Sequence, residues 1–366
     1  MKEFELDSIT DEAIKACEDR HDEFIAQNSA AMDCIRAEKF CDAVELLKPA
    51  AQNGNPLAAF DLGLAHLRGV LGEIDLEKAI FYLEAAALLG AVSAVNVLSQ
   101  IYLNEQNSVF DQDKGLAYLR YAAKRKDLDA MLDLGKRFYE GDLLEQNIAD
   151  AMKWWGTAAH MGDGRACANM GVLYLYGQGV EADPSSAVGF LERGALEGNA
   201  IAQVELGQMY EHGLAVDKDY EQAISLYRLA SMQGHPKGHY YLGAMYEMGK
   251  GCEVDYETAQ KFYQFAAESG LAQAMNSLGS LIGRGLGCEQ DRVKSAKLYI
   301  QAAEAGDITG AFNAGSRLVN GDGVPTDIPR AIRYFEYAAS HGDEDSKVAL
   351  RQLEAFFARA NGNLDS

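Results

Sequence analysis

The chain repeats one pattern of residues every 36 positions, and this repeat constrains its fold more than any other feature. One position closes each unit and reads Gly54, Gly90, Lys126, Gly162, Gly198, Gly234, Gly270, Gly306 and Gly342. Glycine is favoured directly after a helix because it adopts the left-handed backbone conformation without a steric penalty from Cβ. The pattern therefore predicts eight units across residues 55–342, each ending in a helix.

A second register lies inside the first predicted helix of each unit. Its members are Gly63, Ser99, Gly135, Gly171, Gly207, Gly243, Gly279 and Gly315. Glycine costs a helix about 1 kcal/mol relative to alanine, so its recurrence needs a structural reason. We expect two helices to cross closely there, at a point where a Cβ atom would clash.

Twelve residues after each of these positions stands an aspartate or an asparagine. The set is Asp75, Asp111, Asn147, Asp183, Asp219, Asp255, Asp291 and Asp327. Both residue types cap helix N-termini, because the side-chain oxygen accepts a hydrogen bond from an unpaired backbone N–H. Each unit is therefore predicted to be two short helices joined by a loop. Helices of this length are marginal alone, so their stability must come from packing on neighbouring units.

Residues 1–54 are predicted to cap the start of the array with helices and a half-repeat. Ser8-x-x-Asp11 resembles a capping box and predicts a helix that starts near Ile9. Further helical patterns run from about residue 22 to 37 and from residue 40 to 52.

Residues 343–366 are predicted to cap the other end with one helix and a polar tail. The helix is expected from Glu344 to Ala360. Its spacing of apolar residues is helical, so one face should cover the last unit. The residues expected on that face are Leu350, Leu353 and Phe357.

The repeated pattern A-x-x-x-L-G-x-x-Y-x-x-G, D-x-x-x-A and Y-x-x-A-A-x-x-G resembles the Sel-1-like repeat (SLR) family. In the central unit the matching residues are Ala202, Leu206, Gly207, Tyr210, Gly213, Asp219, Ala223, Tyr227, Ala230 and Gly234. The resemblance covers roughly residues 37–342. It implies an all-α fold, a right-handed α-solenoid or superhelix of antiparallel helix pairs related to tetratricopeptide arrays. Members of the family mostly act as adaptors and scaffolds.

Two departures from the family pattern qualify this resemblance. The unit at 91–126 carries Ser99, Glu105, Gly115 and Lys126 in place of the usual residues, which makes it a candidate hinge or specialised surface. A cysteine-rich branch of the family, associated with binding or hydrolysing β-lactams, has paired cysteines in each repeat. The six cysteines here follow no such pattern, so a β-lactam-binding hydrolase is the less favoured alternative. The sequence leaves open whether Cys34 and Cys41 pair.

Composition argues against several classes of partner. The formal net charge is −22, from 55 acidic and 33 basic residues. Such a surface disfavours nucleic acid and anionic membranes, and it would favour a basic protein. The most apolar stretch, residues 79–98, is interrupted at Gly90, so we expect two buried helix segments there and no membrane span. No signal peptide is apparent, and we expect a bacterial cytoplasmic protein.

No metal, cofactor or catalytic site is predicted. His235 and His239 are four residues apart, but His235 precedes Pro236 and should cap a helix, so the two do not form a metal-binding pair on one helix face. The G-x-G loops follow no predicted strand, so they do not indicate a phosphate-binding loop. No G-x-S-x-G motif is present. We therefore expect no enzymatic activity.

A groove lined by the first helices is the favoured binding site. First helices line the concave face of the related tetratricopeptide arrays. The L-G-x-x-Y match transfers that register to positions three before, and one, four and five after, each helix glycine. The predicted partner-binding residues are Tyr139, Glu140, Leu175, Tyr176, Val204, Glu211, His212, Tyr240, Glu247 and Met248. Aromatic residues mixed with acids would suit a peptide that carries Lys or Arg. The alternative is that some of these tyrosines pack between units.

These observations favour a non-enzymatic scaffold or adaptor that binds a protein or peptide in its concave groove. An inhibitor or immunity protein that neutralises a basic toxin is a second interpretation, because many toxins that attack nucleic acid are basic. Both interpretations require a protein partner, and the sequence does not discriminate between them.

Overall fold

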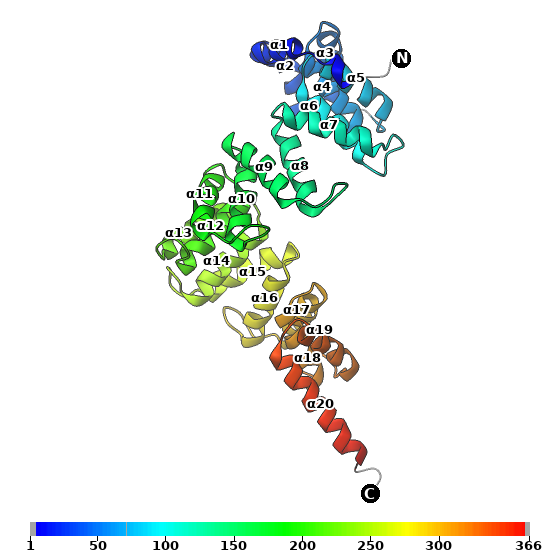
Figure 1. The fold of residues 1–366 in the computed structure, drawn as a ribbon. Coiled ribbons are helices and arrows are strands. Elements are labelled where there is room, and N and C mark those ends of the chain that lie inside the picture. Colours follow the sequence, from blue (N-terminus) through cyan, green and yellow to red (C-terminus); the bar gives the residue numbers. More distant parts are fainter. Residues whose placement is uncertain (1–4, 71, 363–366) are drawn as a thin grey trace. The chain divides into compact units, whose positions relative to one another are not determined.

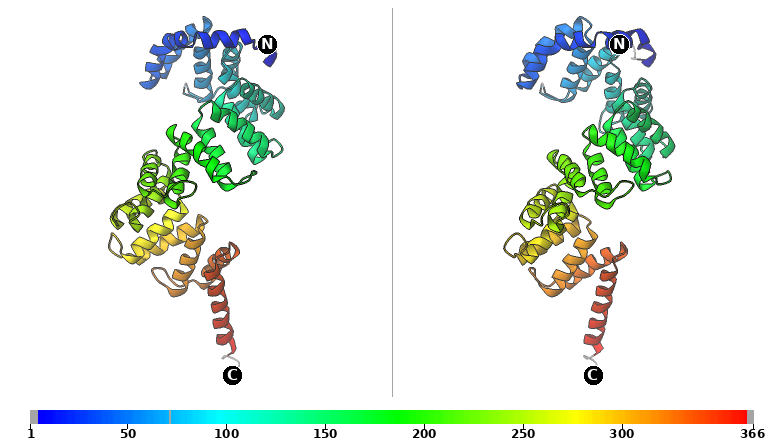
Figure 2. Two further views of the ribbon diagram at one scale, coloured as in Figure 1. Left: turned by 60° about the vertical axis from the view of Figure 1, so that its left-hand side comes forward. Right: turned by 90° about the vertical axis from the view of Figure 1, so that its left-hand side faces the viewer.

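The computed structural model describes residues 5–70 and 72–362 of the chain, and all regular structure within them is helical. The contacts divide the chain into two compact units, Met1–Ala166 and Cys167–Ser366, which are considered separately (Figure 1). Consecutive helices lie side by side from α2 to α9 in unit 1 and from α11 to α20 in unit 2 (Figure 2). The predicted all-α architecture of stacked helix pairs is confirmed.

The described part of unit 1 begins with a short 3₁₀ helix and contains nine complete α-helices. These are η1 (Leu6–Ser8), α1 (Asp11–Asp19), α2 (His21–Arg36), α3 (Phe40–Gln52), α4 (Pro56–Leu67), α5 (Leu76–Leu88), α6 (Val92–Leu103), α7 (Gln112–Lys124), α8 (Leu128–Glu140) and α9 (Ile148–His160). Within it α4 packs on α5, α6 on α7 and α8 on α9, which are the predicted helix pairs. The apolar stretch at residues 79–98 is two helices joined at Gly90, as expected.

Unit 2 contains most of α10 and the remaining helices. These are α10 (Gly164–Tyr176), α11 (Pro184–Leu196), α12 (Ala200–His212), α13 (Tyr220–Met232), α14 (Pro236–Met248), α15 (Tyr256–Glu268), α16 (Ala272–Arg284), α17 (Arg292–Glu304), α18 (Ile308–Asn320), α19 (Ile328–Ser340) and α20 (Glu344–Gly362). The even-numbered helices from α10 to α18 are first helices of repeats, and the odd-numbered ones are second helices. The last helix, α20, packs on α19.

In the first helices other than α6, the register glycine makes room for a large side chain of the second helix. A Cβ atom added at Gly207 would lie 2.6 Å from the Tyr227 ring, and one at Gly243 would lie 2.8 Å from the Tyr263 ring. Both rings are almost fully buried. The close helix crossing predicted from this register is confirmed, and its cause is a bulky residue twenty positions further along the chain.

The second repeat departs from the others at this crossing. Ser99 is buried in α6 and donates its hydroxyl to the Asn96 carbonyl oxygen at 2.6 Å. Gly115 supplies the missing space from α7, because a Cβ atom there would lie 2.6 Å from Leu103. This repeat therefore places its helix-packing glycine on the second helix.

The predicted capping residues sit where the sequence placed them. The eight Asp and Asn side chains at the start of the second helices each accept a backbone N–H from the first turn. The closing positions have positive φ, including Lys126 at 65°. Glycine holds the other closing positions, so Lys126 adopts a conformation that its Cβ atom disfavours.

The start of the first helix was predicted wrongly. Helix α1 begins at Asp11, and its cap is Thr10, whose Oγ1 accepts the Ala13 N–H at 3.1 Å. Ser8 instead ends the 3₁₀ helix, and Ile9 is buried with its carbonyl oxygen accepting the Tyr121 hydroxyl at 3.4 Å. Packing against α7 therefore overrides the local capping signal. The expected helices near residues 22–37 and 40–52 are confirmed as α2 and α3.

Candidate partner-binding site

Eight of the ten predicted binding residues lie on α10, α12 and α14, the first helices of three successive repeats of unit 2. The other two, Tyr139 and Glu140, end α8 in unit 1. Tyr139 packs against Trp155, with ring centroids 5.6 Å apart, and Glu140 is exposed. The site below is built from the residues of unit 2.

Tyr176 joins α10 to α12 through a buried carboxylate. Its side chain is 55% exposed, and its hydroxyl donates to Glu205 Oε2 at 2.6 Å. Glu205 lies in the middle of α12 and is 5% exposed. Partial burial, the hydrogen bond to Glu205 and the charge of that carboxylate all raise the pKa of Tyr176, so its phenol stays a hydrogen-bond donor at physiological pH.

Glu211 forms the second connection, near the end of α12. Its Oε2 accepts the Tyr227 hydroxyl at 2.9 Å, and its Oε1 accepts Lys250 Nζ at 2.7 Å. Because Glu211 is buried, this ion pair is shielded from solvent far better than a surface pair would be. His212 next to it is exposed, and its Nδ1 lies 2.8 Å from the Gln208 carbonyl oxygen.

The third connection lies on α14. Glu247 Oε2 accepts the Tyr263 hydroxyl at 2.7 Å. Tyr240 is half-buried against Tyr241 and Tyr263, with ring centroids 5.2 Å and 5.6 Å away. Its ring therefore belongs partly to the packing between repeats, which is the alternative that the sequence left open.

Tyr241 contacts Tyr227 of the second connection and Tyr240 of the third. Its ring stacks on Tyr227 with centroids 5.0 Å apart, and burial raises the pKa of Tyr241 to about 12. We call the resulting set of side chains the tyrosine–glutamate cluster. It comprises Tyr176, Glu205, Glu211, Tyr227, Tyr240, Tyr241, Glu247, Lys250 and Tyr263.

The remaining predicted residues differ in what they present to solvent. Val204 is 1% exposed, so its side chain is part of the core and offers no contact surface. Met248 is 56% exposed, and Leu175 is half-buried against the core of its repeat.

Sequence reasoning missed several members of the cluster because they lie outside the transferred register. Glu205 is on α12 but off that register, and Tyr227 and Tyr263 are on second helices. A signal was present: glutamate sixteen residues before tyrosine recurs as Glu211 with Tyr227 and as Glu247 with Tyr263. In these repeats the bulky residue over the helix glycine carries a hydroxyl, which needs a partner when it is buried.

The charge of the cluster is negative. Within the residues that the structure describes, Lys250 provides the only ion pair to Glu205, Glu211 or Glu247. The other two carboxylates are held by phenol hydroxyls. Such an arrangement favours a positively charged group, because carboxylates and aromatic ring faces both attract cations.

The described residues hold no group of three or more His, Cys, Asp or Glu side chains arranged to bind a metal ion. His235 stands at the N-cap position of α14, as predicted, but its side chain makes no capping hydrogen bond. His239 Nδ1 lies 2.7 Å from Ser231 Oγ. Cys34 and Cys41 are both free. In the same described segments, no helix combines the length and the apolar character needed to cross a membrane.

Comparison with known structures shows two close resemblances in fold. A protective antigen of uropathogenic Escherichia coli strains with an SLR fold matches at 28% identity and a TM-score of 0.69, covering 86% of this chain and 67% of that one. A Sel1 repeat protein from Oxalobacter formigenes matches at 27% identity and a TM-score of 0.60, covering 84% of this chain and 89% of that one. No curated protein matches the sequence significantly.

The family model described as Sel1 repeat matches the chain eight times. The matched residues are 56–90, 93–127, 128–163, 164–199, 200–235, 236–271, 272–307 and 309–343. The match at 93–127 includes the unit that carries Ser99, Gly115 and Lys126, so that unit is recognised as a Sel1 repeat. The matches span most of the chain, which therefore belongs to the Sel1 repeat family.

Proposed function

We propose that this protein is a non-enzymatic scaffold that binds another protein, and that the tyrosine–glutamate cluster receives a basic side chain of that partner. Membership of the Sel1 repeat family supports a protein-binding role. One observation carries the assignment of the site: the Glu205 carboxylate is buried, yet it is held by the phenol of Tyr176, whose side chain is half exposed.

The geometry suits a guanidinium or an ammonium group. A carboxylate that is already desolvated attracts a cation more strongly than one in bulk water, because the effective dielectric constant is lower. The Tyr176 hydroxyl can turn aside or share the carboxylate, since each carboxylate oxygen has two lone pairs. Neighbouring rings would add cation–π attraction of about 0.5–2 kcal/mol.

The partner can be found by photo-crosslinking from this face. Met248 is exposed and lies on α14 outside the cluster, so benzoylphenylalanine at this position would leave the carboxylates intact. Crosslinking in an extract of the native host should capture one protein above background. The same label at Glu192, which is exposed on the second helix α11, is the matched control.

The affinity of the captured protein then tests the cluster. Glu205→Gln keeps the size of the side chain and removes its charge, so we expect binding to weaken about tenfold, or about 1.4 kcal/mol. Glu192→Gln removes an equal charge from the surface and should change the affinity less than twofold. Equal affinities of the Glu205→Gln variant and the unmodified chain would refute the proposed site.

A further inference from the structure

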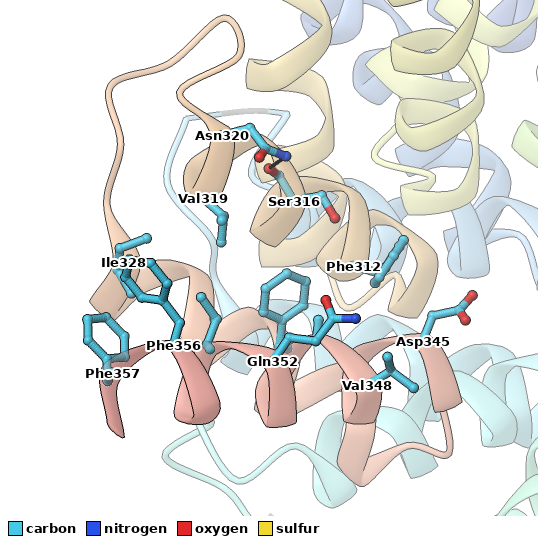
Figure 3. A pocket seen from close by; sticks show the side chains of 13 residues that line it. Phe312, Ser316, Val319, Asn320, Ile328, Asp345, Val348, Gln352, Phe356 and Phe357 are labelled. Atoms are coloured by element: carbon cyan, nitrogen blue, oxygen red, sulfur yellow. Dashed lines mark hydrogen bonds between the residues drawn. The ribbon is translucent and has the colours of Figure 1, made fainter. Parts of the chain in front are cut away.

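An apolar groove lies between α18 and α20 at the end of unit 2. Figure 3 shows α18 on one side of it and α20 on the other, with Phe312 and Val319 facing Val348 and Phe356. Its volume is about 660 Å³, within the range of sites that bind ligands. Phe356 is 65% exposed.

The groove occupies the register that was predicted to bind a partner. The residues of α18 that line it are Phe312, Ser316, Val319 and Asn320. They stand three before, and one, four and five after, Gly315. The corresponding positions of α10, α12 and α14 include Tyr176, Glu211 and Glu247, so the groove belongs to the same face of the first helices.

One repeat earlier in unit 2, a polar contact bridges the first helices α16 and α18. Asn313 donates to Asn276 Oδ1 at 2.8 Å across the two helices. On the same helix, Arg317 lies over the Tyr299 ring of α17, 5.7 Å from its centroid, and pairs with Asp322 in the loop after α18. One repeat later, Ala349 and Leu353 stand where Asn313 and Arg317 would be. At these two positions α20 therefore presents apolar side chains to the groove beside α18.

Resting on the proposed function, we propose that this groove binds the apolar face of a basic amphipathic helix of the partner protein. The groove follows α20 from Asp345 to Phe356, a length of about 17 Å, or three helical turns. A helix of that length presents apolar residues at i, i+4 and i+7 to a groove made by other helices.

Charge selects a basic occupant. Asp345 is the charged residue among those lining the groove, and the whole chain carries a net charge of −22. A second copy of this chain would bring the same charge, so electrostatic repulsion opposes self-association through this face. A basic helix would instead be attracted to Asp345 and to the field of the whole molecule.

A fluorescein-labelled model helix tests the proposal against the full chain. The probe is an amidated 18-residue peptide with leucine at positions 4, 8 and 11 and with lysine and alanine elsewhere, and binding is followed by anisotropy. Phe356→Ser removes apolar surface from the groove, and Ser316→Trp fills the groove. We expect each variant to bind the peptide at least tenfold more weakly. Phe81→Ser is the matched control, because Phe81 of α5 in unit 1 is similarly exposed at 55%. Phe356 is exposed, so its substitution should not unfold the chain.

Peptide controls separate apolar recognition from charge. Replacing the three leucines with serine, or the lysines with glutamate, should each weaken binding at least tenfold. Equal binding of the serine peptide, or of the Phe356→Ser variant, overturns the proposal. So does a dimer in light scattering that Phe356→Ser converts to a monomer, because a second copy would then be the occupant. Glu205→Gln should leave the peptide affinity unchanged, so failure of the groove and failure of the cluster are distinguishable.

Discussion

Two single residues of this chain destabilise the folded state, one through its backbone conformation and one through the burial of a carboxyl group. Lys126 adopts a left-handed conformation, with φ at 65°, at a position where the other repeats have glycine. Asp61 of α4 is partly buried, and its Oδ2 accepts the Asn28 amide at 3.4 Å. Each cost can be removed by one substitution without disturbing the surrounding packing.

Lys126→Gly should stabilise the fold. The left-handed conformation costs a residue with a Cβ atom about 1–2 kcal/mol, which glycine avoids. Glycine also raises the conformational entropy of the unfolded chain, and this offsets part of the stabilisation. We expect a net increase of about 0.5–1 kcal/mol in the free energy of unfolding, measured by urea denaturation. Gly198→Lys is the reverse control, since φ there is 80° and the space around it is open. A destabilised Lys126→Gly variant would contradict this account.

Asp61 should make the fold less stable as pH rises. Burial raises the pKa of Asp61 to about 6, and the Asn28 hydrogen bond lowers it in part. As pH rises, Asp61 therefore loses its proton in the unfolded chain before it does so in the folded chain. Its contribution to the free energy of unfolding is full below pH of about 4 and is lost as pH rises through about 6. Asp61→Asn should raise the free energy of unfolding at pH 7 by about 2 kcal/mol. Denaturation curves at pH 4 and 7 measure the difference in the free energy of unfolding between Asp61→Asn and the parent chain. We expect a smaller difference at pH 4, and an equal difference at both pH values would contradict the role given to Asp61.

At the scale of elements, the helix pair is held by a glycine on one helix and a bulky residue on the next. The pairs Gly207 with Tyr227 and Gly243 with Tyr263 are part of the core of unit 2. The repeat therefore depends on a close contact between helices, and the intrinsic helix preference of each residue is secondary. Glycines in these helices are consequently not equivalent.

The same substitution should have opposite effects at two helical glycines. Gly207→Ala would place a methyl group 2.6 Å from the buried Tyr227 ring, and we expect a loss of about 2 kcal/mol from overpacking. Gly189→Ala, in α11, meets nothing within 4 Å and should gain up to about 1 kcal/mol of helix propensity. Thermal unfolding of the two variants measures both. Similar shifts in Tm for the two would refute the packing argument.

At the scale of the whole molecule, acidity is the dominant property. Some acidic residues are helix caps, and others belong to the tyrosine–glutamate cluster. The chain as a whole has a net charge of −22. Self-repulsion of this size opposes the folded state at low ionic strength, where charges act over longer distances.

Added salt should therefore stabilise the fold. Raising sodium chloride from about 10 mM to about 150 mM shortens the Debye length from about 30 Å to about 8 Å, which screens the repulsion. We expect Tm to rise by a few degrees in calorimetry, and equally with potassium chloride. A Tm that falls with salt would mean that attractive ion pairs dominate over the net charge.

The sequence alone determined the helical repeat, its caps, its closing positions and the helix-packing glycines. The caps and closing positions depend on interactions within one helix turn, and each helix-packing glycine stands at a fixed distance from its bulky partner, so a periodic pattern reveals them. The site was only partly predictable. The register placed Tyr176, Glu211, Tyr240 and Glu247 in the cluster, but it also included Val204, which is buried.

Only the tertiary structure decided which side chains meet. Glu205 and Tyr176 are on neighbouring repeats, and Tyr227 reaches Glu211 from the second helix of its repeat. Likewise, Ala349 and Leu353 line the groove beside α20, whereas one repeat earlier Asn313 bridges α18 to Asn276 of α16. Such contacts depend on the packing of helices in space, which the spacing of residues along one helix does not specify.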